Sequence, residues 1–184
     1  MIIDNDALIP PTDNDTDTIL NSLEDAGYNG GDTNGDGILD SLQPNIASTT
    51  TGGITTGIEV TNACQVLGAL TNSTSESDPN YSYPSGFEAY SLTCAAPGQT
   101  ATISLYFETS LTSTAGVVLR KFNPFTSGYS TISNPVLSII NIGGTNVLKA
   151  VYEVTDGGVL DMDLAGVPAS VPVADGIIVD PVGL

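Results

Sequence analysis

The stretch Thr100-Ala101-Thr102-Ile103-Ser104-Leu105-Tyr106-Phe107 alternates small or polar side chains with apolar ones. Because successive side chains of a β-strand point to opposite faces, this pattern predicts a strand with one buried face. Further apolar stretches lie on both sides of it and are separated by turns rich in Gly, Pro, Asn and Asp. The seven expected strands cover residues 58–67, 87–94, 101–107, 116–122, 136–142, 146–154 and 171–179. They predict an all-β fold, an antiparallel β-sandwich of the jelly-roll or immunoglobulin-like kind.

The charge of the chain restricts its partners. The 184 residues include 21 acidic residues but only 3 basic ones and no His, which gives a formal net charge of −18. Such a surface repels phosphate groups, so binding to nucleic acid or to anionic membrane surfaces is not expected. No apolar stretch has the length of a spanning helix, and no signal-peptide pattern follows Met1. We therefore expect no membrane insertion of this sequence, and any export signal or anchor would lie outside it.

The acidic residues are concentrated at the start of the chain, where 10 of the 21 lie within the first 43 positions. This region contains an internal repeat, in which residues 13–24 match residues 32–43. Self-similarity at a fixed spacing indicates stacked loops of one kind. We therefore expect an acidic calcium-binding repeat segment at residues 1–47 and a β-sandwich domain at residues 48–184. The Thr- and Gly-rich stretch 48–57 is interpreted as a linker or an exposed edge.

Both copies of the repeat have the form of a calcium loop, which alternates side-chain oxygen ligands with spacers and adds a backbone carbonyl at the seventh position. The predicted ligands of the first copy are Asp13, Asp15, Asp17, Ile19 (backbone), Asn21 and Glu24. Those of the second copy are Asp32, Asn34, Asp36, Ile38 (backbone), Asp40 and Gln43. Gly37 holds the sixth position of the second copy, where the turn needs glycine, whereas Thr18 replaces it in the first copy. The first loop is therefore expected to have a looser turn or a weaker affinity. Ordinary solvated acidic loops would explain the charge but not the spacing.

A second group of aspartates follows near the end of the chain, around Gly157-Gly158. Carboxylates brought close together repel unless they are protonated or bridged by a metal. Asp156, Asp161 and Asp163 are therefore candidate ligands of a third calcium site. The alternative is that these residues serve turns, which Asp favours for its own hydrogen bonds.

Cys64 and Cys94 are the two cysteines of the chain. An even count in a sequence with extracellular features predicts a disulfide between them. Two buried free thiols are the alternative.

Two families resemble parts of this sequence. Residues 13–43 resemble the aspartate-rich calcium repeats of the thrombospondin type 3 kind that occur in bacterial surface proteins. The remaining body resembles the choice-of-anchor domains of exported bacterial proteins, in particular type U. This second resemblance is carried by Tyr83-Pro84-Ser85-Gly86-Phe87, Val118-Leu119-Arg120-Lys121-Phe122-Asn123-Pro124, Thr155-Asp156-Gly157-Gly158, Asp161-Met162-Asp163 and Gly176-Ile177-Ile178-Val179-Asp180-Pro181. It implies a surface-displayed extracellular domain and no reaction; Leu164 stands where that family often has Gly.

An enzyme is not expected. The sequence has no His and no phosphate-binding loop, and a carboxylate pair for glycoside hydrolysis cannot be selected from its glutamates. A lysine, Lys121 or Lys149, could form an isopeptide bond with an Asn beside a carboxylate, as in some surface adhesins, but the spacing selects no pair.

Two functions therefore remain. The first is an extracellular structural or adhesive module, stabilised by Ca²⁺, of a microbial surface protein. It would be one subunit of a fibre or filament, with neighbouring modules or copies of itself as partners. The second is a carbohydrate-binding module of a secreted enzyme, with a glycan as partner. The only dense aromatic stretch of the sequence contains Tyr81, Tyr83, Phe87 and Tyr90, and the part from Tyr83 to Phe87 fits a core at least as well as a sugar platform. The first function is therefore favoured.

Overall fold

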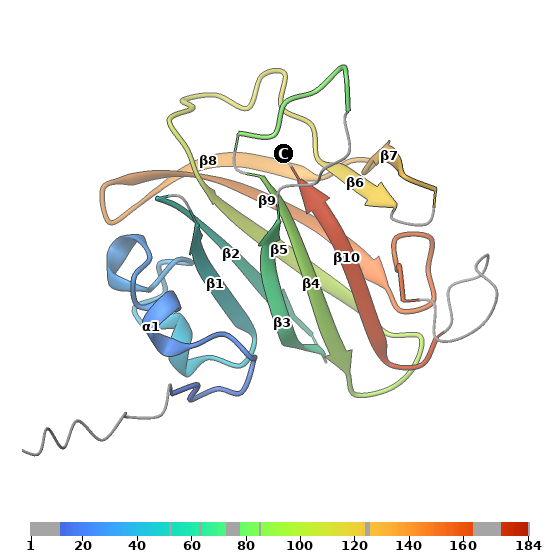
Figure 1. The fold of residues 1–184 in the computed structure, drawn as a ribbon, viewed down its shortest axis with the longest axis horizontal. Coiled ribbons are helices and arrows are strands. Elements are labelled where there is room, and N and C mark those ends of the chain that lie inside the picture. Colours follow the sequence, from blue (N-terminus) through green and yellow to red (C-terminus); the bar gives the residue numbers. More distant parts are fainter. Residues whose placement is uncertain are drawn as a thin grey trace, which may run out of the picture.

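The computed structural model describes residues 12–51, 53–62, 64–72, 78–84, 86–123, 126–163 and 174–183. Two antiparallel five-stranded sheets form a sandwich, with a short helical segment at one side (Figure 1). The predicted all-β sandwich is confirmed. The helical elements are α1 (Asn21–Glu24), η1 (Tyr28–Gly30) and η2 (Asp40–Leu42), where η marks a 3-10 turn. The strands are β1 (Ile46–Thr51), β2 (Ile54–Thr61), β3 (Cys64–Asn72), β4 (Phe87–Cys94), β5 (Thr100–Glu108), β6 (Arg120–Asn123), β7 (Gly128–Thr131), β8 (Val136–Ile142), β9 (Thr145–Thr155) and β10 (Ile177–Gly183).

The first sheet has the strand order β1-β2-β5-β9-β8, and β5 lies at its centre. The alternating stretch that predicted this strand places Ile103 and Leu105 in the core, directly opposite Tyr152 and Ala150 of β9. The second sheet has the order β3-β4-β10-β6-β7. Apolar side chains of both inner faces form one continuous core, and this burial is the main favourable contribution to folding.

The structure corrects several predicted strand boundaries. The single strand expected at 58–67 is two strands in different sheets, β2 and β3, and the chain leaves β2 at Asn62, which has a left-handed φ of 84°. The strand expected at 116–122 starts only at Arg120, and β7 was not predicted. Of the strand expected at 171–179, the first three residues lie outside the described residues, and β10 runs from Ile177 to Gly183.

The Thr-rich stretch 48–57 is not a linker. It forms most of the β1–β2 hairpin, in which Thr49 lies opposite Thr56 and Thr50 opposite Thr55. β-Branched residues pack well on a pleated surface, and cross-strand threonine pairs add hydrogen bonds between their hydroxyls. The other interpretation of this stretch is an exposed edge. β1 is indeed an edge strand of its sheet, but the repeat segment packs against it and covers it.

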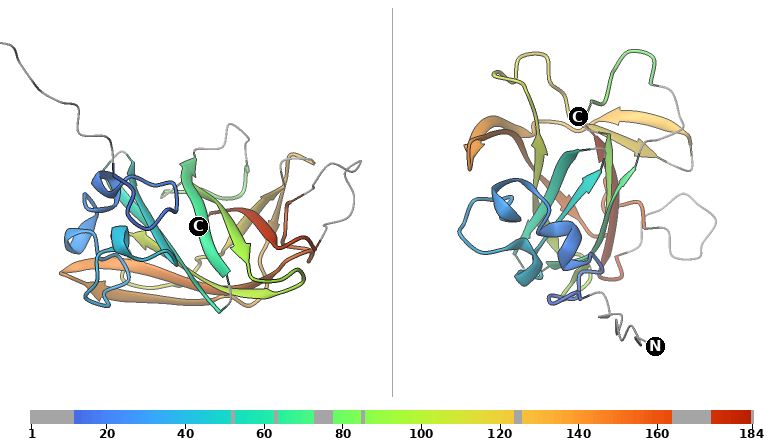
Figure 2. Two further views of the ribbon diagram at one scale, coloured as in Figure 1. Left: turned by 90° about the horizontal axis from the view of Figure 1, so that it is seen from below. Right: turned by 60° about the vertical axis from the view of Figure 1, so that its left-hand side comes forward.

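The repeat segment lies beside β1, where it is drawn in blue (Figures 1 and 2). Two glycines allow its loops to approach the strands. A Cβ atom on Gly57 of β2 would lie 2.7 Å from the Thr33 hydroxyl, and one on Gly68 of β3 would lie 2.9 Å from the Thr18 hydroxyl. Glycine inside a strand often marks such a close approach. Each loop therefore docks on its own glycine, one on each sheet.

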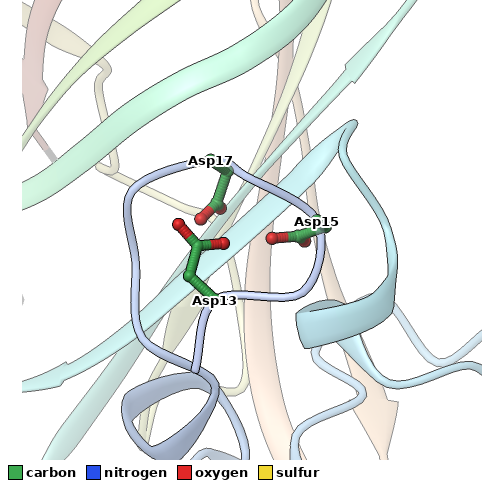
Figure 3. Close-up of side chains that lie close together, drawn as sticks. All are labelled: Asp13, Asp15 and Asp17. Carbon is green, nitrogen blue, oxygen red and sulfur yellow. The ribbon is translucent and has the colours of Figure 1, made fainter. Parts of the chain in front are cut away.

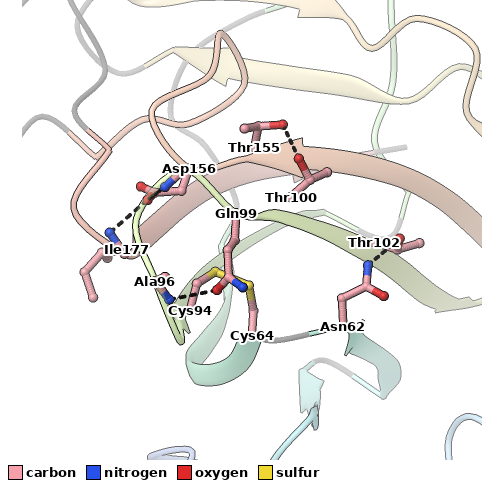
Figure 4. Close-up of a disulfide and its surroundings, with 12 residues drawn as sticks. Asn62, Cys64, Cys94, Ala96, Gln99, Thr100, Thr102, Thr155, Asp156 and Ile177 are labelled. Atoms are coloured by element: carbon pink, nitrogen blue, oxygen red, sulfur yellow. Dashed lines mark hydrogen bonds between the residues drawn. A yellow bond between two sulfur atoms is a disulfide. The ribbon is translucent and has the colours of Figure 1, made fainter.

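The predicted disulfide is present. Cys64 at the start of β3 lies directly opposite Cys94 at the end of β4, and their sulfur atoms are bonded (Figure 4). The bond joins residues 30 positions apart and ties an edge strand to its neighbour. Among the described residues, no helix has the length and apolar character needed to cross a membrane.

We expect the double substitution of Cys64→Ala and Cys94→Ala to lower the free energy of unfolding by about 2 to 4 kcal/mol, because the cross-link restricts the unfolded chain. Urea denaturation followed by circular dichroism measures this. Wild-type protein in reductant is the control and should shift in the same direction. Equal midpoints for oxidised, reduced and substituted protein would show that the cross-link does not contribute to stability.

Candidate metal centre

The first acidic loop brings three carboxylates together. Oxygens of Asp13, Asp15 and Asp17 all lie within 4.8 Å of one another, and the side chains point into the loop (Figure 3). Both oxygens of Asp15 and the Oδ2 atom of Asp17 are buried, and they accept no hydrogen bond from any described residue. A buried carboxylate without partners is unstable as an anion unless a cation compensates it. The three carboxylates thus supply oxygen atoms close enough together to coordinate one cation.

Glu24, on the helix α1, is a further buried acidic side chain of this copy of the repeat. It holds the twelfth position of the loop, is 0% exposed, and neither of its carboxylate oxygens has a partner among the described residues. Burial, followed by the nearby charges of Asp17 and Asp15, raises the pKa of Glu24 to about 9. Burial likewise raises the pKa of Asp17 to about 7. The charge of Glu24 is thus coupled to those of Asp17 and Asp15, whereas the three carboxylates that lie within 4.8 Å of one another are those of Asp13, Asp15 and Asp17.

Backbone hydrogen bonds hold the first loop in shape. Oδ1 of Asp13 accepts from the backbone N–H of Thr16 at 2.7 Å, and its Oδ2 accepts from that of Thr18 at 3.1 Å. Oδ1 of Asp17 accepts from the N–H of Ile19 at 2.7 Å. These bonds occupy both oxygens of Asp13 and one oxygen of Asp17, so the oxygens without donors are Oδ2 of Asp17 and the two oxygens of Asp15.

The two copies share one backbone conformation. The fourth and sixth positions are left-handed in both, at Thr16 (φ 68°) and Thr18 (φ 76°) in the first copy and at Gly35 (φ 78°) and Gly37 (φ 90°) in the second. A β-branched residue at such an angle is strained. The hydroxyl of Thr18 donates to the backbone carbonyl of Leu67 in β3 at 3.1 Å, and this contact offsets part of the strain. The first loop thus forms the same turn without glycine, and its affinity stays a prediction.

The ninth-position side chains bind the backbone of their own loops. Oδ1 of Asn21 accepts from the N–H of Asn14 at 2.9 Å. In the second loop, Asp40 accepts from both the N–H and the hydroxyl of Thr33, at 3.1 and 2.6 Å. Asn14 and Thr33 are the second residues of their loops, so these equivalent contacts clamp each loop closed. That Asn21 and Asp40 also contact a metal stays a prediction.

In the second loop, hydrogen bonds occupy more of the oxygens of the predicted ligands than in the first loop. Asp32 accepts from the N–H groups of Gly35, Asp36 and Gly37. Oδ1 of Asp36 accepts from the N–H of Ile38 at 2.8 Å and from the side chain of Gln43 at 3.3 Å. The amide of Asn34 donates to Oδ2 of Asp36 at 3.3 Å. The predicted ligands therefore gather here as well, but internal donors occupy several of their oxygens.

The C-terminal aspartates hold turns together. Oδ2 of Asp156 accepts from the N–H groups of Gly98 and Gly176, at 2.7 and 2.8 Å. Asp161 accepts from the N–H groups of Gly157, Asp163 and Val179. Backbone donors that compensate a buried carboxylate favour the interpretation of these residues as turn-forming. Asp163 is partly buried, and a third calcium site stays a prediction.

The apolar residues of the repeat lie in unequal surroundings. Ile19, at the seventh position of the first loop, is 5% exposed and belongs to the sandwich core, whereas Ile38 at the same position of the second loop is 50% exposed. Leu23, Leu39 and Leu42 are also exposed. Only the first loop is therefore anchored by its apolar side chain.

Most of the aromatic stretch 81–90 serves the core. Phe87 and Tyr90 are buried, and Tyr83 packs on Phe87 at a centroid distance of 4.5 Å. Tyr81 is exposed, and the guanidinium of Arg120 lies 4.2 Å from the centre of its ring. Tyr81, Tyr83 and Arg120 line part of a groove of about 370 Å³. One exposed ring provides a limited platform for a sugar.

Comparisons of this chain with protein-family models, with curated protein sequences and with solved structures found no match.

We expect Ile19→Ala to lower the free energy of unfolding by about 2 to 4 kcal/mol, because it leaves a cavity between the first loop and the core. The matched variant Ile38→Ala should cost less than about 1 kcal/mol, because that side chain is half exposed. Chemical denaturation of both variants in excess calcium gives the comparison. Similar losses for the two would contradict the unequal anchoring of the loops.

Proposed function

We propose that this chain is an extracellular structural or adhesive module of a microbial surface protein, and that its repeat segment binds Ca²⁺. The observation that carries the proposal is the set of buried oxygens of Asp15, Asp17 and Glu24 without partners among the described residues. Three carboxylates of this kind repel one another and favour either protonation or a bound cation. Of these two possibilities, the spacing of the repeat predicts the bound cation.

The ligand chemistry favours calcium over other metals. All candidate ligands are carboxylate, amide or backbone oxygens, whereas zinc and copper prefer imidazole and thiolate. The chain has no His, and both of its cysteines are in the disulfide. Magnesium needs near-ideal octahedral geometry and retains several waters, while calcium accepts the irregular, larger set of oxygens that a flexible loop supplies.

The extracellular part of the proposal is supported by the disulfide. Disulfides persist in oxidising environments such as the extracellular space. Extracellular calcium concentrations are also suited to modules that bind Ca²⁺ with only modest affinity. The resemblance to thrombospondin type 3 repeats and to choice-of-anchor domains of type U agrees with this location. The structural or adhesive role follows from the same resemblance.

The repeat segment is suited to a junction with a neighbouring module or a second copy. It packs on β1 and β3 of its own sandwich, yet Leu23, Ile38, Leu39 and Leu42 remain exposed on it. Exposed apolar side chains on a short, metal-stabilised segment are features of a surface that another domain covers. Metal binding and docking would then be coupled, as expected for a fibre or filament subunit.

A glycan-binding module is the second candidate, and the groove beside Tyr81 and Arg120 favours it. Its sugar binding would not depend on the calcium loops, which contact other strands. Binding of a soluble glycan in the presence of a chelator would therefore support this candidate over the first.

We expect Asp17→Asn and Glu24→Gln to have opposite effects with and without metal. In chelator they should leave stability unchanged or increase it, because they remove repulsion between buried carboxylates. In calcium they should weaken binding at least about tenfold, which corresponds to ~1.4 kcal/mol. Calorimetric titration and thermal denaturation give both quantities. Glu153→Gln, at an exposed site on β9, is the control and should behave as wild type. Destabilisation of the loop variants in chelator with unchanged calcium affinity would argue against the metal centre.

We expect a protein carrying Asp32→Ala and Asp36→Ala to lose calcium-dependent assembly with its neighbouring module or with itself. The second loop carries three of the four exposed apolar side chains of the repeat segment. Loss of its folded conformation would therefore alter the docking surface. Small-angle scattering and electron microscopy of the full-length protein, with and without calcium, measure this. An unchanged rigid particle or an intact fibre would refute the junction role.

A further inference from the structure

A lysine and an aspartate meet inside the sandwich. Lys121 on β6 is 1% exposed and Asp180 on β10 is 0% exposed. In the antiparallel register Lys121 lies opposite Val182, so Asp180 is its diagonal neighbour on the same inner face. Nζ of Lys121 directly contacts Oδ1 of Asp180. The nucleophilic and the acyl group of a side-chain amide are thus held in contact.

Two tyrosines hold the other oxygen of this carboxyl group. The hydroxyls of Tyr90 and Tyr152 each donate to Oδ2 of Asp180 at 2.9 Å. Tyr90 lies opposite Asp180 on β4, while Tyr152 comes from β9 in the other sheet. Burial raises the pKa of Tyr90 and of Tyr152, so both hydroxyls remain protonated donors. One oxygen of Asp180 therefore faces the amine, and the other faces two donors.

We propose that Lys121 and Asp180 condense spontaneously to an intramolecular isopeptide bond between Nζ and Cγ, with release of one water molecule. The reaction needs no oxidant, cofactor or second substrate, because the pair contains every atom that the product and the water require.

Lys121 and Asp180 supply every proton and electron pair that the reaction transfers. One proton passes from the ammonium Nζ to Oδ1, which leaves a neutral amine beside a protonated carboxyl group. The lone pair of Nζ attacks Cγ, the Nζ–Cγ bond forms, and the electron pair of the carbonyl moves onto Oδ2. The Tyr90 and Tyr152 hydroxyls stabilise this oxyanion, as preorganised donors do in acyl transfer. A second proton passes from Nζ to Oδ1, the Cγ–Oδ1 bond breaks, and water leaves a neutral amide.

Burial favours both the reactive form and the product. Desolvation lowers the pKa of Lys121, against the opposing negative charge of Asp161, and this favours the neutral amine that the attack on Cγ requires. An ion pair in an apolar interior carries a large desolvation cost, which an uncharged amide avoids. Fixed proximity of the two groups supplies the effective concentration that a bimolecular condensation in water lacks.

The other cations of the chain serve as internal comparisons. Nζ of Lys149 donates to the hydroxyl of Tyr106 at 2.8 Å, and a phenol has no acyl carbon to attack. Arg120 pairs with Asp78, but a guanidinium is always protonated and a poor nucleophile. The geometry therefore selects Lys121, and its partner is an aspartate rather than the asparagine considered from the sequence.

The bond would anchor a weakly attached part of the fold. β6 pairs with β10 over two residue positions, Val182 with Lys121 and Gly183 with Arg120. A covalent link at this place would fasten the β6–β7 hairpin to the sheet and would join two residues that lie 59 positions apart in the sequence.

Intact-mass spectrometry of the denatured, reduced protein tests the proposal directly. We expect a mass lower than that of the sequence by one water molecule, and a chymotryptic digest should contain one branched peptide that joins residues 121 and 180. Lys121→Met, which retains the apolar stem and removes the amine, should have the full mass of its sequence. A wild-type mass equal to that of the sequence would overturn the proposal, whatever the stability of the variants.

The extent of condensation as a function of time after synthesis tests the role of the hydroxyls. We expect Tyr90→Phe and Tyr152→Phe each to slow bond formation by roughly 100-fold, as loss of one oxyanion donor does elsewhere. Tyr106→Phe removes a buried hydroxyl that donates to Glu59 instead, and should react at the wild-type rate. Equal rates in all three variants would remove Tyr90 and Tyr152 from the mechanism.

Discussion

The scarcity of positive charge is the constraint on which the rest of this structure depends. Three cations accompany 21 acidic residues, and all three are engaged within the fold. Their partners are Asp78 for Arg120, Asp180 for Lys121 and Tyr106 for Lys149. Every other buried carboxylate must be compensated by something else. Backbone N–H groups compensate Asp156 and Asp161 and a threonine compensates Asp40, whereas buried oxygens of Asp15 and Asp17 in the first loop have no hydrogen-bond donor among the described residues.

This constraint joins the repeat segment to the sandwich. The first loop places Ile19 in the shared core and rests the Thr18 hydroxyl on β3, while the second loop rests Thr33 on β2. The loops therefore cover the β1 edge, which would otherwise present unpaired backbone groups to other chains. Under the proposed function, repulsion between the carboxylates of a metal-free loop would oppose this packing, and bound Ca²⁺ would support it. Under that proposal, charge compensation and protection of the sheet edge would be parts of one equilibrium.

Local patterns predicted the features that depend on local chemistry. The alternation in residues 100–107 identified the central strand, the cysteine count predicted the disulfide, and the spacing of 19 residues identified loops with a common backbone. Features that depend on tertiary contacts were not accessible. Ile19 and Ile38 occupy equivalent positions, yet only one meets the core. The second loop has the better sequence pattern, yet the first has the uncompensated oxygens, because burial rather than spacing decides which carboxylates lack donors. Nothing in the sequence pairs Lys121 with Asp180, which the sheet register brings together.

The lateral contacts of the second sheet have a mechanical consequence. The disulfide ties β3 to β4, Tyr90 ties β4 to Asp180 of β10, and Asp180 ties β10 to Lys121 of β6. Four adjacent strands are thus connected in series by side chains as well as by backbone hydrogen bonds. A tensile load that peels one strand from a sheet breaks the backbone hydrogen bonds of that strand one after another. In this sheet such a load would also have to break the disulfide and the buried contacts of Asp180 before these four strands could separate.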